Sequence, residues 1–177
     1  MQVRTYLLFT GAKTLKILVF SDSHGSTLFM RRALNMHRDA EAVFFLGDGL
    51  ADVDTLAYMF PHVAWIAVRG NNDFSGLFRG REVEELESIV LGGFKIVATH
   101  GNHYYVKHGT GAIKRLARQQ EADIVLFGHT HTPYEEYVPD DAHPFYLFNP
   151  GAASGYAPSF GVITLDKTPL LSHGRFI

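Results

Sequence analysis

The residues with the clearest potential for chemistry are two histidines, His129 and His131, which stand one threonine apart at the end of the apolar run ADIVLFGHTH. Side chains at positions i and i+2 of an extended segment point to the same side, so the two imidazoles are predicted to converge on one object. Imidazole is a common ligand of transition metals. The pair therefore indicates a metal site, but alone it does not exclude two ordinary histidines.

Four further apolar runs end in polar residues suited to metal binding, namely Asp22 with His24, Asp48, Asn71 and His100. Taken singly, the aspartate and the asparagine fit turn positions. The carboxyl ends of strands in an open α/β sheet share one edge, and unpaired polar groups are costly to bury. Five independent coincidences are therefore hard to sustain. We predict one site from seven side chains: Asp22, His24, Asp48, Asn71, His100, His129 and His131.

This set of carboxylates, imidazoles and one amide oxygen suits Mn, Fe, Zn, Co or Ni better than Mg or Ca, which prefer shells made of oxygen alone. Seven ligands are more than one tetrahedral or octahedral ion needs, but they suit two ions that share a bridging carboxylate. Two metal ions roughly 3.5–4 Å apart form the clamp that is used for in-line displacement at phosphorus.

The elements that must position these residues alternate between strand and helix in the first half of the chain. Strand-then-loop patterns cover residues 15–25, 41–49 and 62–73. Helical spacing predicts helices over 26–39, with Ser26 as N-cap, and over 51–60, ended by Pro61. Two strands joined at Gly92–Gly93 follow over 81–101, then a helix over 111–123, a strand ending at 131, and short strands. This pattern predicts one α/β domain with two packed sheets and helices outside.

Composition limits the classes of function. At 177 residues, with 46% hydrophobic and 19% charged residues, the chain fits one globular domain. A net charge of −2 gives no basic field for nucleic acid or membrane, and no apolar stretch approaches the roughly 20 residues of a membrane helix. The absence of cysteine excludes thiolate metal sites. We predict a cytoplasmic protein with an N-terminal extension over 1–13 and a single domain over 14–177.

Five motifs follow one another along the chain in the order SDSHG, LGDG, RGNND, THG and FGHTH. Together they resemble the motifs of the calcineurin-like metallophosphoesterases, and the size and the NPG of FNPGAAS make the chain most similar to the small YfcE-like phosphodiesterase branch. The resemblance implies a four-layer αββα sandwich of two mixed β-sheets flanked by helices, with a dinuclear metal site at the strand C-terminal ends. It implies two divalent metal ions, with manganese favoured and iron, zinc, nickel or cobalt possible.

The resemblance also distributes the ligands between the two ions. Asp22, His24, Asp48 and His131 would hold one metal, and Asp48, Asn71, His100 and His129 would hold the other, with Asp48 as the bridge. A hydroxide that bridges the ions would attack the phosphorus of a small phosphate ester, a phosphodiester above all.

Two positions depart from the pattern of many superfamily members. Asn72 stands where a histidine often protonates the leaving group, and an amide cannot donate a proton in this pH range. Asn102 stands where relatives often have another histidine, and the adjacent His103 is either a substitute acid or phosphate contact, or an ordinary surface histidine. The candidate catalytic residues are Asp48, Asn71, Asn72 and His103. Asp73 is expected to orient a ligand.

Two alternative functions stay open at this point. One is a phosphomonoesterase, and the other is a non-catalytic protein-binding scaffold, as in the retromer subunit that shares this fold but whose metal positions have diverged. The seven intact ligands favour an enzyme. We expect a small phosphate-ester substrate and neither a nucleic-acid nor a membrane partner, while the sequence leaves homo-oligomer formation undecided.

Overall fold

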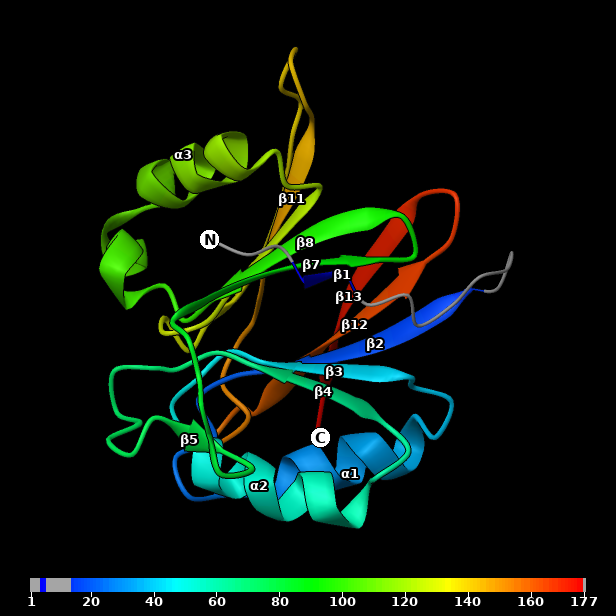
Figure 1. The fold of residues 1–177 in the computed structure, drawn as a ribbon, viewed down its shortest axis with the longest axis vertical. Coiled ribbons are helices and arrows are strands. Elements are labelled where there is room, and N and C mark those ends of the chain that lie inside the picture. The colour runs from blue at the N-terminus through cyan, green and yellow to red at the C-terminus, as the bar shows by residue number, and fades with distance from the viewer. Residues whose placement is uncertain (1–3, 6–13, 177) are drawn as a thin grey trace.

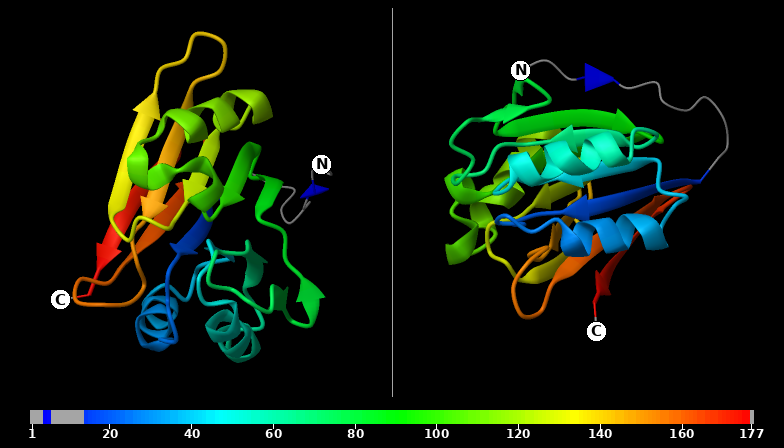
Figure 2. Two further views of the ribbon diagram at one scale, coloured as in Figure 1. Left: turned by 90° about the vertical axis from the view of Figure 1, so that its left-hand side faces the viewer. Right: turned by 90° about the horizontal axis from the view of Figure 1, so that it is seen from below.

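Two β-sheets pack face to face in the computed structural model, which describes residues 4–5 and 14–176 of the chain (Figure 1). Helices α1 (Leu28–Met36) and α2 (Leu50–Met59) lie side by side on the outer face of one sheet (Figure 2), and α3 (Gly111–Gln120) covers the outer face of the other. The predicted four-layer αββα sandwich of mixed sheets is confirmed.

The five-stranded sheet has the order β13-β12-β2-β3-β4. Strands β2 (Leu15–Phe20), β3 (Ala42–Phe45) and β4 (Ala64–Ala67) are parallel and are connected through α1 and α2. Strands β12 (Ser159–Leu165) and β13 (Pro169–Arg175) are antiparallel and join the sheet beside β2. The carboxyl ends of the three parallel strands therefore lie at one edge, where a site is expected to form.

The six-stranded sheet has the order β1-β7-β8-β9-β11-β10. Its strands are β1 (Arg4–Thr5), β7 (Leu86–Leu91), β8 (Phe94–Thr99), β9 (Ile124–Phe127), β10 (Pro133–Val138) and β11 (Phe145–Pro150). The predicted hairpin between β7 and β8 is confirmed, and Gly92 and Gly93 have φ values of 57° and 86°. A tight hairpin turn with two such residues matches the twist of its strands, which explains the glycine pair.

Short elements between the main strands were not predicted. A two-stranded ribbon joins β5 (Leu77–Phe78) to β6 (Arg81–Glu82), and two 3₁₀ turns, η1 (Asn102–Tyr104) and η2 (Val106–His108), precede α3. The prediction of Ser26 as the N-cap of α1 is wrong. The helix begins at Leu28 with Thr27 as its N-cap, because the Ser26 amide donates to the Ser23 carbonyl in the preceding loop.

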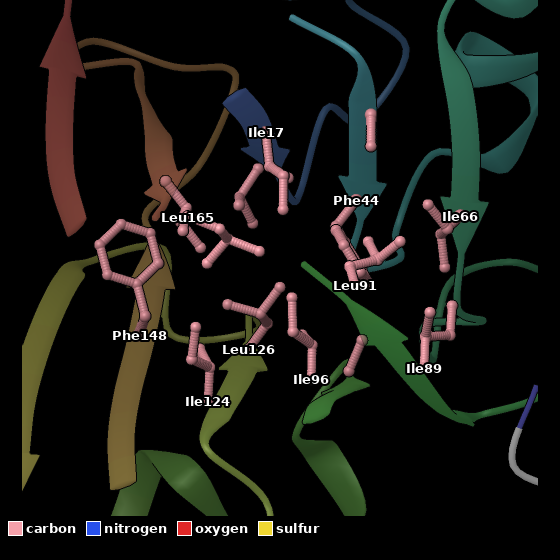
Figure 3. Packing of buried hydrophobic residues seen from close by; sticks show 14 of the residues in the cluster. Ile17, Phe44, Ile66, Ile89, Leu91, Ile96, Ile124, Leu126, Phe148 and Leu165 are labelled. Atoms are coloured by element: carbon pink, nitrogen blue, oxygen red, sulfur yellow. The ribbon is translucent and has the colours of Figure 1, made fainter. Parts of the chain in front are cut away.

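Three apolar layers hold the sandwich together. The central layer fills the space between the sheets and contains Ile17, Phe44, Ile96 and Leu126 (Figure 3). A second layer lies under α1 and α2, and a third lies under α3. Because both faces of the central strands are buried, these strands read as continuous apolar runs, and the polar residues begin where each run ends.

No helix in the described part of the chain combines the length and apolar character needed to cross a bilayer. The division into an extension over 1–13 and a domain over 14–177 stays a prediction. Residues 1–3 and 6–13 lie outside the described residues, and the intervening Arg4–Thr5 pairs in parallel with β7.

Candidate metal centre

Loops that follow the ends of β2, β3, β4, β8 and β9 carry the seven predicted ligands. Six of them fall into two groups, and within each group the candidate ligand atoms lie within 4.8 Å of one another. The seventh, an asparagine, borders the second group. The groups are Asp22, His24 and His131, and Asp48, His100 and His129.

The first group opens toward solvent. Asp22 Oδ1 lies 3.2 Å from His131 Nε2 and 3.9 Å from His24 Nε2, and the two imidazole nitrogens are 3.3 Å apart. The Asp22 side chain is fully buried, whereas the His24 and His131 side chains are 35% and 49% exposed. A ligand entering the site therefore meets these two histidines on the open side.

The second group is more deeply buried. His100 Nδ1 donates to the Leu46 carbonyl at 2.7 Å, which leaves the lone pair of the neutral ring on Nε2. This nitrogen lies 3.1 Å from Asn71 Oδ1, 3.1 Å from His129 Nδ1 and 3.5 Å from Asp48 Oδ2. Several electron-pair donors thus point at one small space.

The donor set fits divalent cations. Asp22 Oδ1 is buried and has no hydrogen-bond donor among the described residues. Asp22 and Asp48 are 0% and 2% exposed, and in the described part of the chain neither forms an ion pair with a lysine or an arginine. Burying carboxylates without a counter-charge is expensive. Cations between the two groups would supply that charge, and the imidazoles select transition metals over Mg or Ca.

The surroundings of the site shift the pKa values of its residues in different directions. Burial raises the pKa of Asp48, but hydrogen bonds from the protonated form of His100 and from the Asn72 backbone amide lower it by more, so the pKa ends well below its usual range. Burial lowers the pKa of His100, but the Asp48 and Asp22 carboxylates outweigh this effect and raise the pKa overall. Burial, followed by the charge of His100, lowers the pKa of His129. The low pKa of Asp48 thus keeps this carboxylate ionised and able to bind a cation.

Five of the seven candidate ligands adopt left-handed backbone conformations. Their φ values are 57° at Asp22, 45° at His24, 62° at Asp48, 68° at His129 and 60° at His131. Such conformations cost on the order of 1–3 kcal/mol each for residues other than glycine and tend to occur at functional sites. The surrounding contacts must therefore hold these loops in place.

The prediction that His129 and His131 project together from an extended strand is wrong in its geometry. Strand β9 ends at Phe127, and both histidines lie in the loop beyond it with positive φ. Each histidine joins a different group, His131 beside Asp22 and His129 beside His100. The left-handed turns replace strand alternation as the cause of their placement.

Two glycines allow the loops after β3 and β4 to touch. A Cβ atom on Gly47 would lie 2.5 Å from the Gly70 nitrogen, and a Cβ on Gly70 would lie 2.2 Å from Asp48 Oδ1. Gly47 also has a φ of 95°. Side chains at either position would therefore push Asp48 out of the site.

Asp73 holds the Asp48 loop from behind. Its Oδ2 accepts hydrogen bonds from the amides of Asp48 and Gly70 at 2.8 and 2.9 Å. Its Oδ1 accepts from the amides of Gly49 and Leu50 at 2.8 and 2.9 Å, at the start of α2. The expectation that Asp73 orients a ligand is consistent with these contacts, which act through the backbone.

Sequence reasoning did not single out three other side chains that hold the ligand loops. Asp52 accepts from Ser23 Oγ at 2.6 Å and from the Gly25 amide at 2.8 Å, beside the loop of Asp22 and His24. Ser154 Oγ donates to the Asp22 carbonyl at 2.8 Å, and Asn149 contacts the loop of His129 and His131. The signals were present only as an aspartate in GDGLAD and the asparagine of NPG.

A cavity elsewhere in the molecule contains none of the predicted ligands. It measures about 660 Å³ and is lined by residues of β4, of the β5–β6 ribbon and of β7. Its walls include Trp65, Phe78 and Ile89. The chemistry of the candidate site thus belongs to the strand-end edge and not to this cavity.

The sequence-family model of the calcineurin-like phosphoesterase superfamily domain matches residues 15–168. This chain belongs to the calcineurin-like phosphoesterase superfamily. The superfamily is metal-dependent, in agreement with the two groups of candidate ligands. The predicted superfamily is thereby confirmed.

A curated phosphodiesterase resembles the chain in sequence, and two solved structures share its fold. The chain is 25% identical over 167 residues to phosphodiesterase MJ0936 of Methanocaldococcus jannaschii, and the alignment covers 86% of this chain and 95% of that protein. The structure of vacuolar protein sorting 29 from Cryptosporidium parvum aligns with a TM-score of 0.71 at 19% identity, covering 92% and 98% of the two chains. YfcE, a phosphoesterase from E. coli, aligns with a TM-score of 0.61 at 21% identity, covering 88% and 98%.

Asn72 stands where a general acid is often found, but here it forms hydrogen bonds to Asp48. The Asn72 amide donates to Asp48 Oδ1 at 2.8 Å, and its Nδ2 donates to Asp48 Oδ2 at 2.7 Å. Both carboxylate oxygens are thus oriented by one residue. His103 is exposed and lies with Nε2 3.1 Å from Glu85 Oε2. Its catalytic role, like that of Asn72, stays a prediction.

Proposed function

We propose that this chain is a metal-dependent hydrolase of small phosphodiesters that uses two divalent ions. The proposal rests on the convergence of imidazole nitrogens with two buried carboxylates, Asp22 and Asp48, which form no ion pair with a lysine or arginine in the described part of the chain. Asp22, His24, Asp48 and His131 would hold one ion, and Asp48, Asn71, His100 and His129 the other. The mixed nitrogen and oxygen donors of both groups suit Mn, Fe, Zn, Co or Ni, and the resemblance to the family favours manganese among them.

The ions would supply, when bound, a nucleophile at neutral pH and positive charge for the phosphate oxygens. Asp48 would link the two groups, and its orientation is fixed by the two hydrogen bonds from Asn72. The exposed imidazoles of His24 and His131 mark the side from which the phosphate would approach. As charge builds on the phosphate oxygens, these imidazoles would also help to hold it.

The leaving group would depart without help from Asn72. Its side-chain amide donates one hydrogen to Asp48 Oδ2, and an amide does not release a proton near neutral pH. The enzyme should therefore lack a general-acid contribution of about 10²–10⁴-fold, unless His103 supplies it. This argues for substrates with good leaving groups, such as aryl esters or activated diesters.

The test is Mn²⁺-dependent hydrolysis of bis(p-nitrophenyl) phosphate, run in parallel with p-nitrophenyl phosphate. His131→Ala should abolish most of the activity, because it removes a ligand from the exposed group. His62→Ala is the matched control, since His62 is exposed and its ring contacts only Phe60 among the ring pairs of the described residues. Undiminished activity in His131→Ala would remove the proposal, and a faster monoester reaction would replace the diesterase with a phosphomonoesterase.

A protein-binding scaffold is the competing function, because vacuolar protein sorting 29 shares the fold. Vps29 from Entamoeba histolytica has been crystallised in complex with zinc, so metal binding alone does not separate a scaffold from an enzyme. Inactivity of the Mn²⁺-loaded wild-type protein on both esters would favour the scaffold.

A further inference from the structure

The loop from Gly128 to Thr132 carries one histidine of each ligand group, yet it has few contacts of its own to hold it. His129 and His131 both have positive φ, and the loop's internal bonds are the short Thr130 amide to Gly128 carbonyl contact at 2.8 Å and weak contacts between Thr130 and Thr132. A strained loop of this kind must be fixed from outside to present two imidazoles accurately.

The Gly128 amide donates to the His100 carbonyl and the His129 amide to Asp22 Oδ2, each at 3.0 Å, and Asn149 adds the support from the other side. It is fully buried at the end of β11, and its Nδ2 donates to the Gly128 carbonyl at 2.9 Å and to Thr130 Oγ1 at 3.0 Å. Its Oδ1 accepts from the Gly151 amide at 2.9 Å. One carboxamide thus bonds to the residues on both sides of His129, and all its polar atoms have partners.

His173 holds Asn149 from the other sheet. It lies on β13, and because a carbonyl can only accept, His173 Nε2 donates to the Asn149 carbonyl at 2.8 Å. The His173 ring stacks on the Phe148 ring with centroids 4.5 Å apart and an interplanar angle of 18°. Strand β13 belongs to the five-stranded sheet and β11 to the six-stranded sheet, so this contact ties the two sheets together directly behind the histidine loop.

We propose that Asn149 and His173 are positioning residues of the metal centre, which act on His129 and His131 through the loop backbone. The inference rests on the proposed function, since it requires that the histidines bind metal. Neither residue reaches a candidate ligand atom itself. Partners that orient metal ligands typically change metal affinity by 10–100-fold when they are removed, and the sequence gives no local sign that a residue of the C-terminal strand takes part.

The experiment measures Mn²⁺ binding by isothermal titration to metal-free protein, at a temperature where circular dichroism shows every variant to be folded. Asn149→Ala should weaken Mn²⁺ binding by about 10–100-fold. Ser159→Ala is the matched control, because Ser159 is also buried and donates to the neighbouring Pro150 carbonyl at 2.7 Å without touching the loop. The control should bind Mn²⁺ as the wild type does.

A second pair of variants keeps the proposal testable if Asn149→Ala does not fold. His173→Phe preserves a ring for stacking but removes the donor, and should weaken binding by about 2–10-fold, the worth of one hydrogen bond. His173→Gln retains a donor and should recover part of the affinity. His37→Phe is the control, since His37 is half-buried and its ring contacts Phe160 on β12, at the end of α1.

The outcomes separate the two proposals. Wild-type affinity in Asn149→Ala and in His173→Phe, with two ions bound by the wild type, would overturn the positioning role and leave the proposed function standing. Absence of Mn²⁺ binding by the wild type would overturn both. A loss of affinity that is equal in the Ser159 and His37 controls would also overturn the positioning role, because general loosening of the fold would then explain it.

Discussion

Replacing Asp73 by asparagine tests whether one carboxylate holds the loop of the bridging ligand. The native side chain accepts four amide hydrogens, two on each oxygen. In Asp73→Asn the amide oxygen can keep one pair, but the NH₂ group must then face the other two N–H groups, which lose their acceptor. Each buried donor without a partner costs about 1–3 kcal/mol, so the variant should lose about 2–6 kcal/mol of unfolding free energy.

The assay is urea unfolding of metal-free protein followed by circular dichroism. Asp54→Asn is the control, because Asp54 is exposed and accepts from a single amide, that of Arg79, at 2.7 Å. The control should change the unfolding free energy by no more than about 0.5 kcal/mol. A loss of 2–6 kcal/mol is a large part of the 5–15 kcal/mol typical of a domain. A change in Asp73→Asn as small as that of the control would refute the reasoning about this loop.

Three further predictions concern other parts of the molecule. Gly47→Ala should destabilise the protein and weaken Mn²⁺ binding, since φ is 95° and the added Cβ would lie 2.5 Å from a backbone nitrogen; thermal unfolding and titration check this. Asn72→His should accelerate hydrolysis of alkyl diesters relative to aryl diesters, and an unchanged ratio of rates would contradict the account. Hydrogen bonds from Lys114, followed by Tyr134, lower the pKa of Glu136 below its ordinary 4.5, so its contribution is present above that pH and is lost as the pH falls. Glu136→Gln should therefore reduce stability more at pH 7 than at pH 3, in urea titrations at both values.

The placement of the candidate site could be predicted because it depends on where apolar runs end along the sequence. Buried parallel strands read as apolar runs, and each run ends at the same edge of its sheet. Asp22, Asp48 and His100 were located in this way, and the structure brings them together with the other ligands. The hairpin and the approximate positions of the helices followed from proline, glycine and helical spacing, although α1 and α3 each end three residues before the predicted end.

The supports of the site could not be predicted, because they join residues that are distant along the chain. Asn149 acts on a loop about 20 positions earlier, and His173 reaches it from the opposite sheet. The left-handed conformations of His129 and His131 could not be predicted from the sequence either, since histidine does not favour positive φ as glycine does. Strand order and the antiparallel addition of β12 and β13 also depend on such long-range pairing. Cytoplasmic location and oligomeric state stay predictions.

The most direct measurement is anomalous diffraction at the manganese edge from crystals of the full chain grown with Mn²⁺. The account predicts two peaks, one beside His24 and His131 and one beside His100 and His129, with Asp48 between them. A single peak, or peaks remote from these side chains, would contradict the claim that the strand-end residues form a dinuclear centre.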